Sequence, residues 1–330
     1  MKTQIYAEHS MLELPDDLLR QYIDASSSFT ALEEAEREQS HVRGGMYWHK
    51  GHHSAPANFY LMRTAPSGSE KSLGPRSEDT ERIYEAFQAR KREAQTRVSG
   101  LRDAVEKQSR MNRALRVGRV NPLIVDLLNR LVTSGLHDHF RVVGTHALYA
   151  YESAAGVRVD NATIATQDID LLWDVRKRVQ FSTALKRLDS SMLGVLRKVD
   201  PTFRVRDSQK YTAVNKDGFE VDILRRETTA DDPHPVQLSD DENDFWVTQA
   251  PRAQELLDCA AFSAVIVATN GNMARMETLE PMAFVRFKRW MGSLKDRDIL
   301  KRRRDVSQAE VVEKMVRDYL PQWDKKASLE

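Results

Sequence analysis

An acidic stretch near the middle of this 330-residue chain constrains the fold more than any other part of the sequence. Asp168 and Asp170 lie inside an apolar run that is typical of a buried β-strand. Because successive side chains of a strand point to opposite faces, the two aspartates share one face, and Ile169 and Leu171 share the other. Two like charges side by side in a core are costly unless a cation lies between them, and carboxylate oxygens suit Mg²⁺ or Mn²⁺. The stretch therefore predicts a metal-binding strand.

The segments on either side of this strand predict a sheet with helices around it. Before it come a short strand at 140–143, a turn at Gly144-Thr145-His146, and a helix that Gly156 closes. After it come one or two helices in 175–198 and strands at 203–206, 211–214 and 219–224. The last strand follows a hairpin signal at Asp217-Gly218, and its alternation places Glu220 and Asp222 on one face. A third acidic position is thus expected beside the first two, with Asp222 as the first candidate and Glu220 as the alternate.

Composition excludes several classes of protein. A hydrophobic fraction of 41% is enough to fill a core, and a net charge of +1 gives no global attraction to nucleic acid or membrane. The single cysteine, Cys259, excludes an internal disulfide framework and a cysteine-based zinc site. No secretory signal opens the chain and no apolar run approaches a membrane span, so we expect a cytoplasmic protein with no membrane partner.

The flanking regions predict mostly helices. The N-terminal part is expected to hold a helix over about 15–43, a β-hairpin over about 46–73 and a long charged helix over about 78–116. The basic and aromatic residues of the hairpin leave two readings open, contact with nucleic acid or packing on the neighbouring helices. An acidic linker over 227–244, a helix over 252–262, a hairpin around Asn270-Gly271 and two C-terminal helices are expected to follow.

The motifs Val143-Gly144-Thr145, Asp168-Ile169-Asp170 and Val221-Asp222-Ile223 together resemble the signature of nucleotidyltransferases of the DNA polymerase beta superfamily. There a glycine and a small hydroxyl residue open a helix, and an acidic pair and a third acid follow on strands. The stretches 71–76 and 142–148 make the chain more closely similar to bacterial nucleotidyltransferase-fold proteins related to abortive-infection toxins. The resemblance extends from about residue 45 to 309. Thr145 stands where Gly or Ser is most often seen, and 157–165 reads as an extra loop near the site.

The resemblance implies an α+β fold, with a mixed β-sheet core and flanking helices. The expected regions are a helical N-terminal region carrying the hairpin (1–120), the nucleotidyltransferase core (121–230) and a mainly helical, substrate-binding C-terminal region (231–330). It implies a metal-dependent enzyme that transfers NMP from an NTP, for example ATP, to a hydroxyl acceptor such as tRNA or a protein. A toxin-type role with an antitoxin-like partner is implied as well.

Each predicted site residue has a role in that chemistry. Asp168 and Asp170 would hold Mg²⁺ or Mn²⁺ against the phosphates, and Asp222 would complete the metal site or accept the acceptor's proton. Gly144 lets the backbone approach a phosphate, and the Thr145 hydroxyl can donate to it. Lys288 matches the position of a triphosphate-contacting lysine in related enzymes, although a solvated helix residue is the other reading of it.

Two further interpretations compete with the enzyme. A catalytically inactive module of the same fold would bind nucleic acid or a partner protein, but it has little reason to keep three buried carboxylates. A metal-dependent phosphodiesterase would need a histidine that activates the nucleophile beside the acids. A histidine that is packed and hydrogen-bonded is the expected state of His146.

Overall fold

The computed structural model describes residues 11–51, 59–229 and 236–324. The chain divides into two compact units, one formed by Arg20–Ala114 and the other by the residues before and after that segment. The larger unit combines helices with a mixed sheet, so the predicted α+β fold is confirmed.

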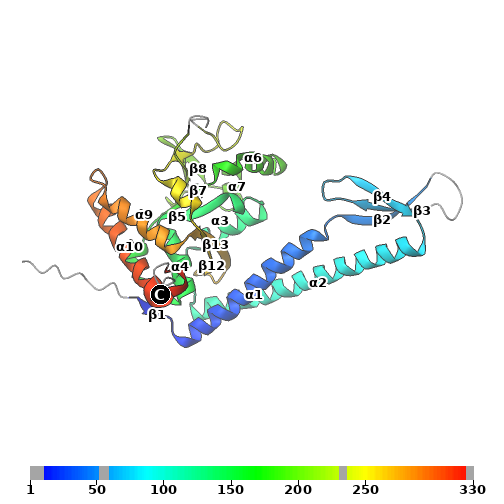
Figure 1. Ribbon diagram of the computed structural model, residues 1–330, viewed down its shortest axis with the longest axis horizontal. Helices are drawn as coiled ribbons and strands as arrows, with labels where there is room; N and C mark the ends of the chain where they lie inside the picture. The colour runs from blue at the N-terminus through cyan, green and yellow to red at the C-terminus, as the bar shows by residue number, and fades with distance from the viewer. Residues whose placement is uncertain (1–10, 52–58, 230–235, 325–330) are drawn as a thin grey trace, which may run out of the picture. The chain divides into compact units, whose positions relative to one another are not determined.

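The smaller unit consists of two long helices and a three-stranded sheet (Figure 1). The helices are α1 (Asp16–His41) and α2 (Glu78–Leu115), and the antiparallel strands are β2 (Gly45–Lys50), β3 (Phe59–Thr64) and β4 (Glu70–Pro75). Polar contacts join the helices, for example from Gln21 to Gln108 (2.7 Å) and to Asn112 (3.0 Å). The predicted hairpin therefore has a third strand, and most of the loop between β2 and β3 lies outside the described residues.

A mixed sheet forms the centre of the larger unit, in the order β5-β7-β10-β9-β8, with β11 paired to the end of β10. The strands are β5 (Phe140–Val143), β7 (Asp168–Trp173), β8 (Arg204–Arg206), β9 (Gln209–Val214), β10 (Glu220–Arg225) and β11 (Thr248–Gln249). β7 and β10 are parallel, whereas β5 runs antiparallel to β7 and β9 runs antiparallel to β10. The two acidic strands are therefore neighbours at the centre of the sheet.

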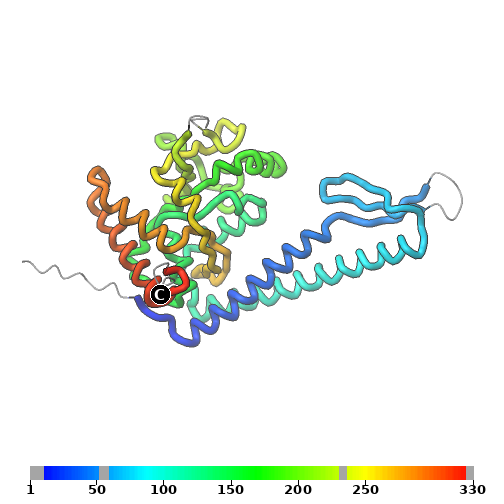
Figure 2. Tube along the Cα trace, viewed as in Figure 1, coloured from blue at the N-terminus to red at the C-terminus, as the bar shows by residue number. Residues whose placement is uncertain are grey.

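Helices and a second, two-stranded sheet surround the central sheet. The helices are α3 (Pro122–Thr133), α4 (Ala147–Ala155), α5 (Asn161–Ile164), α6 (Arg178–Arg187), α7 (Met192–Arg197), α8 (Ala253–Asp258), α9 (Pro281–Ser293) and α10 (Ile299–Tyr319). Short 3₁₀ helices are η1 (His137–His139), η2 (Gly144–His146), η3 (Val175–Lys177) and η4 (Pro321–Trp323), and the second sheet pairs β12 (Ala261–Val267) with β13 (Met273–Leu279). Helices α9 and α10 run side by side (Figure 2). Among the described helices, none has the length and apolar composition that crossing a membrane requires.

A continuous hydrophobic core joins the elements that were predicted as separate core and C-terminal regions. Tyr151 of α4 packs edge-on against Phe262 of β12 and Phe284 of α9, with ring centroids 5.2 and 5.6 Å apart. Its hydroxyl donates to the Leu279 carbonyl at 2.8 Å. Ile169 of the acidic strand belongs to the same core, so the apolar face of β7 is buried as its alternation indicated. The helices α9 and α10 are therefore fixed relative to the acidic strands.

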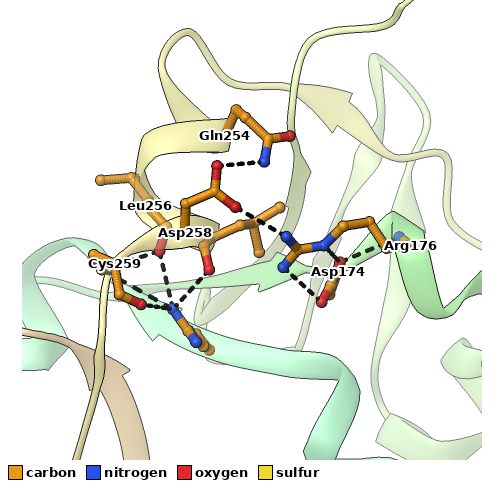
Figure 3. A network of polar contacts seen from close by, with 8 residues as sticks. Asp174, Arg176, Gln254, Leu256, Asp258 and Cys259 are labelled. Atoms are coloured by element: carbon orange, nitrogen blue, oxygen red, sulfur yellow. Dashed lines mark hydrogen bonds and ion pairs between the residues drawn. The ribbon is translucent and has the colours of Figure 1, made fainter.

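A polar network holds α8 against the sheet (Figure 3). Arg141 of β5 donates to the carbonyl oxygens of Leu256 (3.0 Å) and Cys259 (3.0 Å) at the end of this helix. Arg176 joins Asp174, which follows β7, to Asp258 of α8 through contacts of 2.8 and 2.9 Å. Asp174 is thus a strand-end residue that caps η3, outside the group of site acids although it belongs to the same acidic run.

Three segments differ from their sequence interpretation. The helix expected over 252–262 ends at Asp258, because the next residues pair with β13 in continuous register from Ala261↔Leu279. The segment 157–165 is not a simple loop, since it holds α5 and the strand β6 (Val157–Arg158), which pairs with β1 (Leu12–Glu13). Within the acidic linker, whose residues 230–235 lie outside the described part, Asp244 is buried rather than solvated. Its carboxylate accepts from the backbone N–H groups of Met192 and Leu193 at the start of α7.

Candidate active site

The pairing of β7 with β10 brings the three predicted acids together. Asp170 and Asp222 are direct partners in the parallel register, and Asp168 is the partner of Glu220. One carboxylate oxygen from each of Asp168, Asp170 and Asp222 lies within 4.8 Å of those of the other two. All three side chains are partly exposed, so the cluster is accessible from solvent. The geometry suits a group of ligands around a divalent cation.

Gly144 follows β5 at the point where the chain passes closest to this cluster. Its φ of +70° is one that residues with a side chain rarely adopt, and a Cβ there would lie 2.2 Å from Oδ2 of Asp170. The register places Val143 directly opposite Asp170, which explains the close approach. The sequence predicted that the glycine leaves room for a phosphate, and the structure shows that it leaves room for the Asp170 carboxylate. Its contact with a phosphate stays a prediction.

The electrostatics of the cluster show an excess of negative charge. Burial, together with the charges of Asp168 and Asp222, raises the pKa of Asp170 from 3.8 to about 7. Burial also raises the pKa of Asp222, although a hydrogen bond from the Thr212 hydroxyl (2.5 Å) works against it. Asp168 accepts a hydrogen bond from the Thr166 hydroxyl. Three hard oxygen donors, of which Asp170 and Asp222 have raised pKa values, are the set that Mg²⁺ or Mn²⁺ would stabilise, so the residues fit the predicted metal.

Two cations and one anion form a cluster on α9, α10 and the loop between them. Nζ of Lys288, on α9, is 2.8 Å from Oδ1 of Asp305 on α10, and Nε of Arg297 is 2.6 Å from Oδ2 of the same residue. Lys288 is 5% exposed and Asp305 is fully buried. Burial lowers the pKa of Lys288, while the charges of Asp305 and Asp170 oppose that shift. The interpretation of Lys288 as a solvated helix residue is therefore wrong.

The cluster acts electrostatically on the acidic strands. The charges of Lys288 and Arg297 both lower the pKa of Asp170, against the larger effects that raise it. Sequence reasoning found Lys288 but missed Asp305 and Arg297. The available signal was one aspartate directly after the run Lys301-Arg302-Arg303-Arg304 on a helix, a place where a lone acid must have cationic neighbours.

Thr145 and His146 are buried in η2, next to the glycine. Oγ1 of Thr145 accepts a hydrogen bond from Nε2 of Gln308 (3.2 Å), which also donates to the Thr163 carbonyl (2.8 Å). A hydroxyl that accepts a hydrogen bond keeps its own proton for donation. Thr145 can therefore still donate to a phosphate oxygen, and that contact stays a prediction.

His146 is packed but not hydrogen-bonded, in contrast to the expectation. Its ring stacks with Tyr149 at 5.7 Å and with Phe219 at 6.3 Å, and neither ring nitrogen has a hydrogen-bond partner among the described residues. Burial lowers its pKa to about 4, with the charge of Asp168 acting in the opposite direction. A neutral imidazole beside the acids adds no positive charge to the cluster.

Glu220, the alternate candidate for the third acid, has a different partner. Its carboxylate forms an ion pair with the Arg206 guanidinium of β8, whereas Asp222 lies within the cluster of aspartates. The alternation of β10 could not separate the two residues, because both share a face. The ion pair with Arg206 of β8 occupies Glu220, and the register of β10 on β7 brings Asp222 to Asp170.

A comparison with protein-family models matches residues 123–330 to a family described as nucleotidyltransferase. The matched part contains every predicted site residue and leaves the N-terminal unit outside. Comparisons with curated proteins and with solved structures gave no match.

Proposed function

Because the chain belongs to the nucleotidyltransferase family, we propose that it transfers a nucleoside monophosphate from a nucleoside triphosphate to a hydroxyl acceptor. The observation that carries this proposal is the group of Asp168, Asp170 and Asp222, whose carboxylate oxygens lie within 4.8 Å of one another. Two of them are direct partners across the parallel strands β7 and β10, so the backbone determines their spacing.

In the proposed reaction, Asp168 and Asp170 hold Mg²⁺ or Mn²⁺, and Asp222 completes the set. Such ions neutralise phosphate oxygens and stabilise the charge that develops in nucleotidyl transfer. The acceptor oxygen forms a bond to the α-phosphorus, and the bond from that phosphorus to the oxygen bridging to the β-phosphate breaks. Pyrophosphate leaves with the bonding electrons.

The remaining residues of the site have complementary tasks. The Thr212 hydroxyl donates a hydrogen bond to Oδ1 of Asp222. The other carboxylate oxygen is left to bind an ion or to accept the proton of the acceptor hydroxyl. The raised pKa of Asp222 favours proton uptake. Lys288, held by Asp305, is proposed to contact the triphosphate, and Gly144-Thr145 to hold a phosphate at the start of the following helix.

The acceptor is proposed to be tRNA or a protein, and the biological role that of a toxin with an antitoxin-like partner. The support for both is the resemblance of the motifs to toxin-related members of the superfamily. Exposed basic residues of the segment before and within α10, including Lys295, Lys301 and Arg303, would suit a polyanionic acceptor.

The test is to incubate the protein with each of the four α-³²P-labelled NTPs, Mg²⁺ or Mn²⁺, and either total RNA or cell lysate. Label should pass to an acceptor with the wild type and with Asp174→Asn, which changes an acid of the same run outside the site. It should not pass with Asp168→Asn or Asp170→Asn. Nucleotide binding without transfer for all four NTPs would instead identify the inactive binding module. Growth arrest on expression, lost with the same two variants, would support the toxin role.

A further inference from the structure

Gln308 is a fully buried amide on α10 that contacts two other elements beside the acid cluster. Its Nε2 lies 2.8 Å from the carbonyl oxygen of Thr163 on α5 and 3.2 Å from Oγ1 of Thr145 on η2. Both threonines are 6% exposed, so the two contacts are made in the interior. One side chain thus joins α10 to the turn that begins at Gly144 and to the segment that leads into Asp168.

The carbonyl of Thr163 determines the direction of both hydrogen bonds. A backbone carbonyl oxygen can only accept, so the amide atom beside it must be the nitrogen of Gln308. The same nitrogen faces Thr145, and an amide nitrogen can only donate. Oγ1 of Thr145 is therefore the acceptor, and the proton of its hydroxyl must point away from Gln308.

The proton of the Thr145 hydroxyl has no acceptor among the described residues. Because buried donors in folded proteins are nearly always paired, this proton points to a group that the described chain does not supply. Gly144, the residue before it, lies against the Asp170 carboxylate, so the hydroxyl belongs to a turn that touches the acid cluster. A phosphate oxygen held beside these acids by a divalent ion is an acceptor of the required kind.

Packing alone does not account for an amide at position 308. Oε1 of Gln308 is buried and has no hydrogen-bond partner among the described residues. Methionine has a similar length and volume and would leave no buried acceptor unpaired. What the amide adds over an apolar side chain is the donor that Thr145 and the Thr163 carbonyl share.

The same face of α10 also supports the other group that is proposed to bind phosphate. Asp305 and Gln308 are three residues apart on the helix, so they project from one face. Asp305 holds Lys288 at 2.8 Å, and Gln308 holds Thr145. One helix therefore positions both a cation and a hydroxyl beside the acids.

We propose that Gln308 is a positioning residue, which orients the Thr145 hydroxyl so that it donates to a phosphate oxygen of the nucleoside triphosphate. The amide supplies the hydrogen bond that Oγ1 accepts, and the hydroxyl proton is thereby directed to the nucleotide before the nucleotide binds. Such preorganisation strengthens binding, because the cost of ordering the donor does not fall on the binding step. This inference rests on the proposed function, since the triphosphate is the substrate of that reaction.

The test measures the binding of the four α,β-methylene nucleoside triphosphates, which cannot transfer NMP because carbon replaces the oxygen that bridges the α- and β-phosphates. Calorimetry with Mn²⁺ identifies the analogue that binds the wild type most tightly. Thr145→Val should weaken its binding at least about tenfold, because a hydrogen bond to a charged oxygen is lost. Thr145→Ser should keep the affinity, because the hydroxyl remains.

The role of Gln308 is measured by a double-mutant cycle with Thr145. Gln308→Met should weaken the binding of the same analogue about fivefold, as expected for the loss of one neutral hydrogen bond, and Gln308→Leu should do likewise. In a chain that also carries Thr145→Val, Gln308→Met should have no further effect, because no hydroxyl is left to orient.

A variant of the same helix controls for stability. Val312 is fully buried four residues after Gln308 on α10. Val312→Ala should lower the midpoint of urea unfolding, because it opens a cavity, and should keep the affinity for the analogue. Circular dichroism verifies that each variant has folded.

The outcomes separate this inference from the proposed function. If an analogue binds the wild type but Gln308→Met binds it equally well, or loses the same factor with and without Thr145→Val, the positioning role is wrong and the proposed function stands. If none of the four analogues binds the wild type, the proposed function fails and this inference fails with it. A loss that requires Thr145 and is absent from Val312→Ala supports the positioning role.

Discussion

Replacement of Asp170 by asparagine should make the metal-free protein more stable at pH 8. Asp170 is the acid most strongly disfavoured as an anion, because it is largely buried and faces Asp168 and Asp222. Asparagine has nearly the same shape and no charge, so it removes the repulsion without opening a cavity. A residue that weakens the folded chain in this way is expected where the site is built for a cation.

The magnitude follows from the pKa of Asp170. A rise from 3.8 to about 7 is roughly three units, and each unit corresponds to about 1.4 kcal/mol. Because the folded pKa is raised, the stability contributed by the protonated form is fully present below pH 3.8 and is lost as the pH rises through about 7. The penalty at pH 8 is therefore at most about 4 kcal/mol, and about 2–4 kcal/mol once the partial exposure of the side chain is considered.

Urea unfolding in EDTA, followed by tryptophan fluorescence, measures the effect at pH 8 and pH 4.5. The gain of Asp170→Asn should be large at pH 8 and should shrink markedly at pH 4.5. Asp174→Asn is the matched control. Although burial works to raise the pKa of Asp174, its hydrogen bonds and ion pair with Arg176 outweigh burial and hold that pKa below its usual value. That variant should lose stability at pH 8. If Asp170→Asn were no more stable than the wild type at pH 8, the account of charge repulsion in the site would be wrong.

Three further outcomes are expected. Asp305→Asn should cost about 3–5 kcal/mol in urea unfolding and abolish NMP transfer, because it leaves the buried Lys288 and the partly exposed Arg297 without their anion. A loss below about 1 kcal/mol would contradict this. His146→Phe should keep the aromatic stack. In the wild type, a pKa lowered to about 4 keeps the folded His146 ring neutral while the unfolded ring protonates, so the wild type should lose about 3 kcal/mol of stability as the pH falls from 6.5 to 4, and the variant should not. The same pH dependence of stability in both proteins would refute the lowered pKa of His146. The affinity for Mn²⁺, measured by calorimetry, should rise about tenfold per pH unit toward pH 7 and then level off, because the ion displaces a proton from Asp170. An Mn²⁺ affinity that does not change between pH 5 and 7 would contradict this displacement of a proton.

Local patterns were enough to predict much of this protein. The alternation around Asp168 and Asp170 predicted a strand with a carboxylate face, and the bounds of β7 agree with it. Gly156 was correctly placed at the left-handed end of α4. These features depend on neighbours in the chain, and so they can be inferred from spacing and residue type alone.

Other features depend on which segments pair. Residues 70–75 contain Gly74 and Pro75 and lack clear alternation, so only their register with β3 shows that they form a strand. The end of α8 was misplaced, because the pairing of β12 with β13 overrides the helical tendency of the residues around Cys259. Local preference is weak compared with a full ladder of backbone hydrogen bonds.

The active site shows the same division. The sequence was sufficient to identify three acids and a glycine, and to infer a metal from the cost of placing like charges together. Only the tertiary structure decided that Asp222 rather than Glu220 joins the cluster, because Arg206 neutralises Glu220. It also decided that Gly144 must lack a side chain beside Asp170, since that approach arises from the register of β5 on β7. Charges and volumes that meet across separate strands have no trace in the spacing of the residues along the chain.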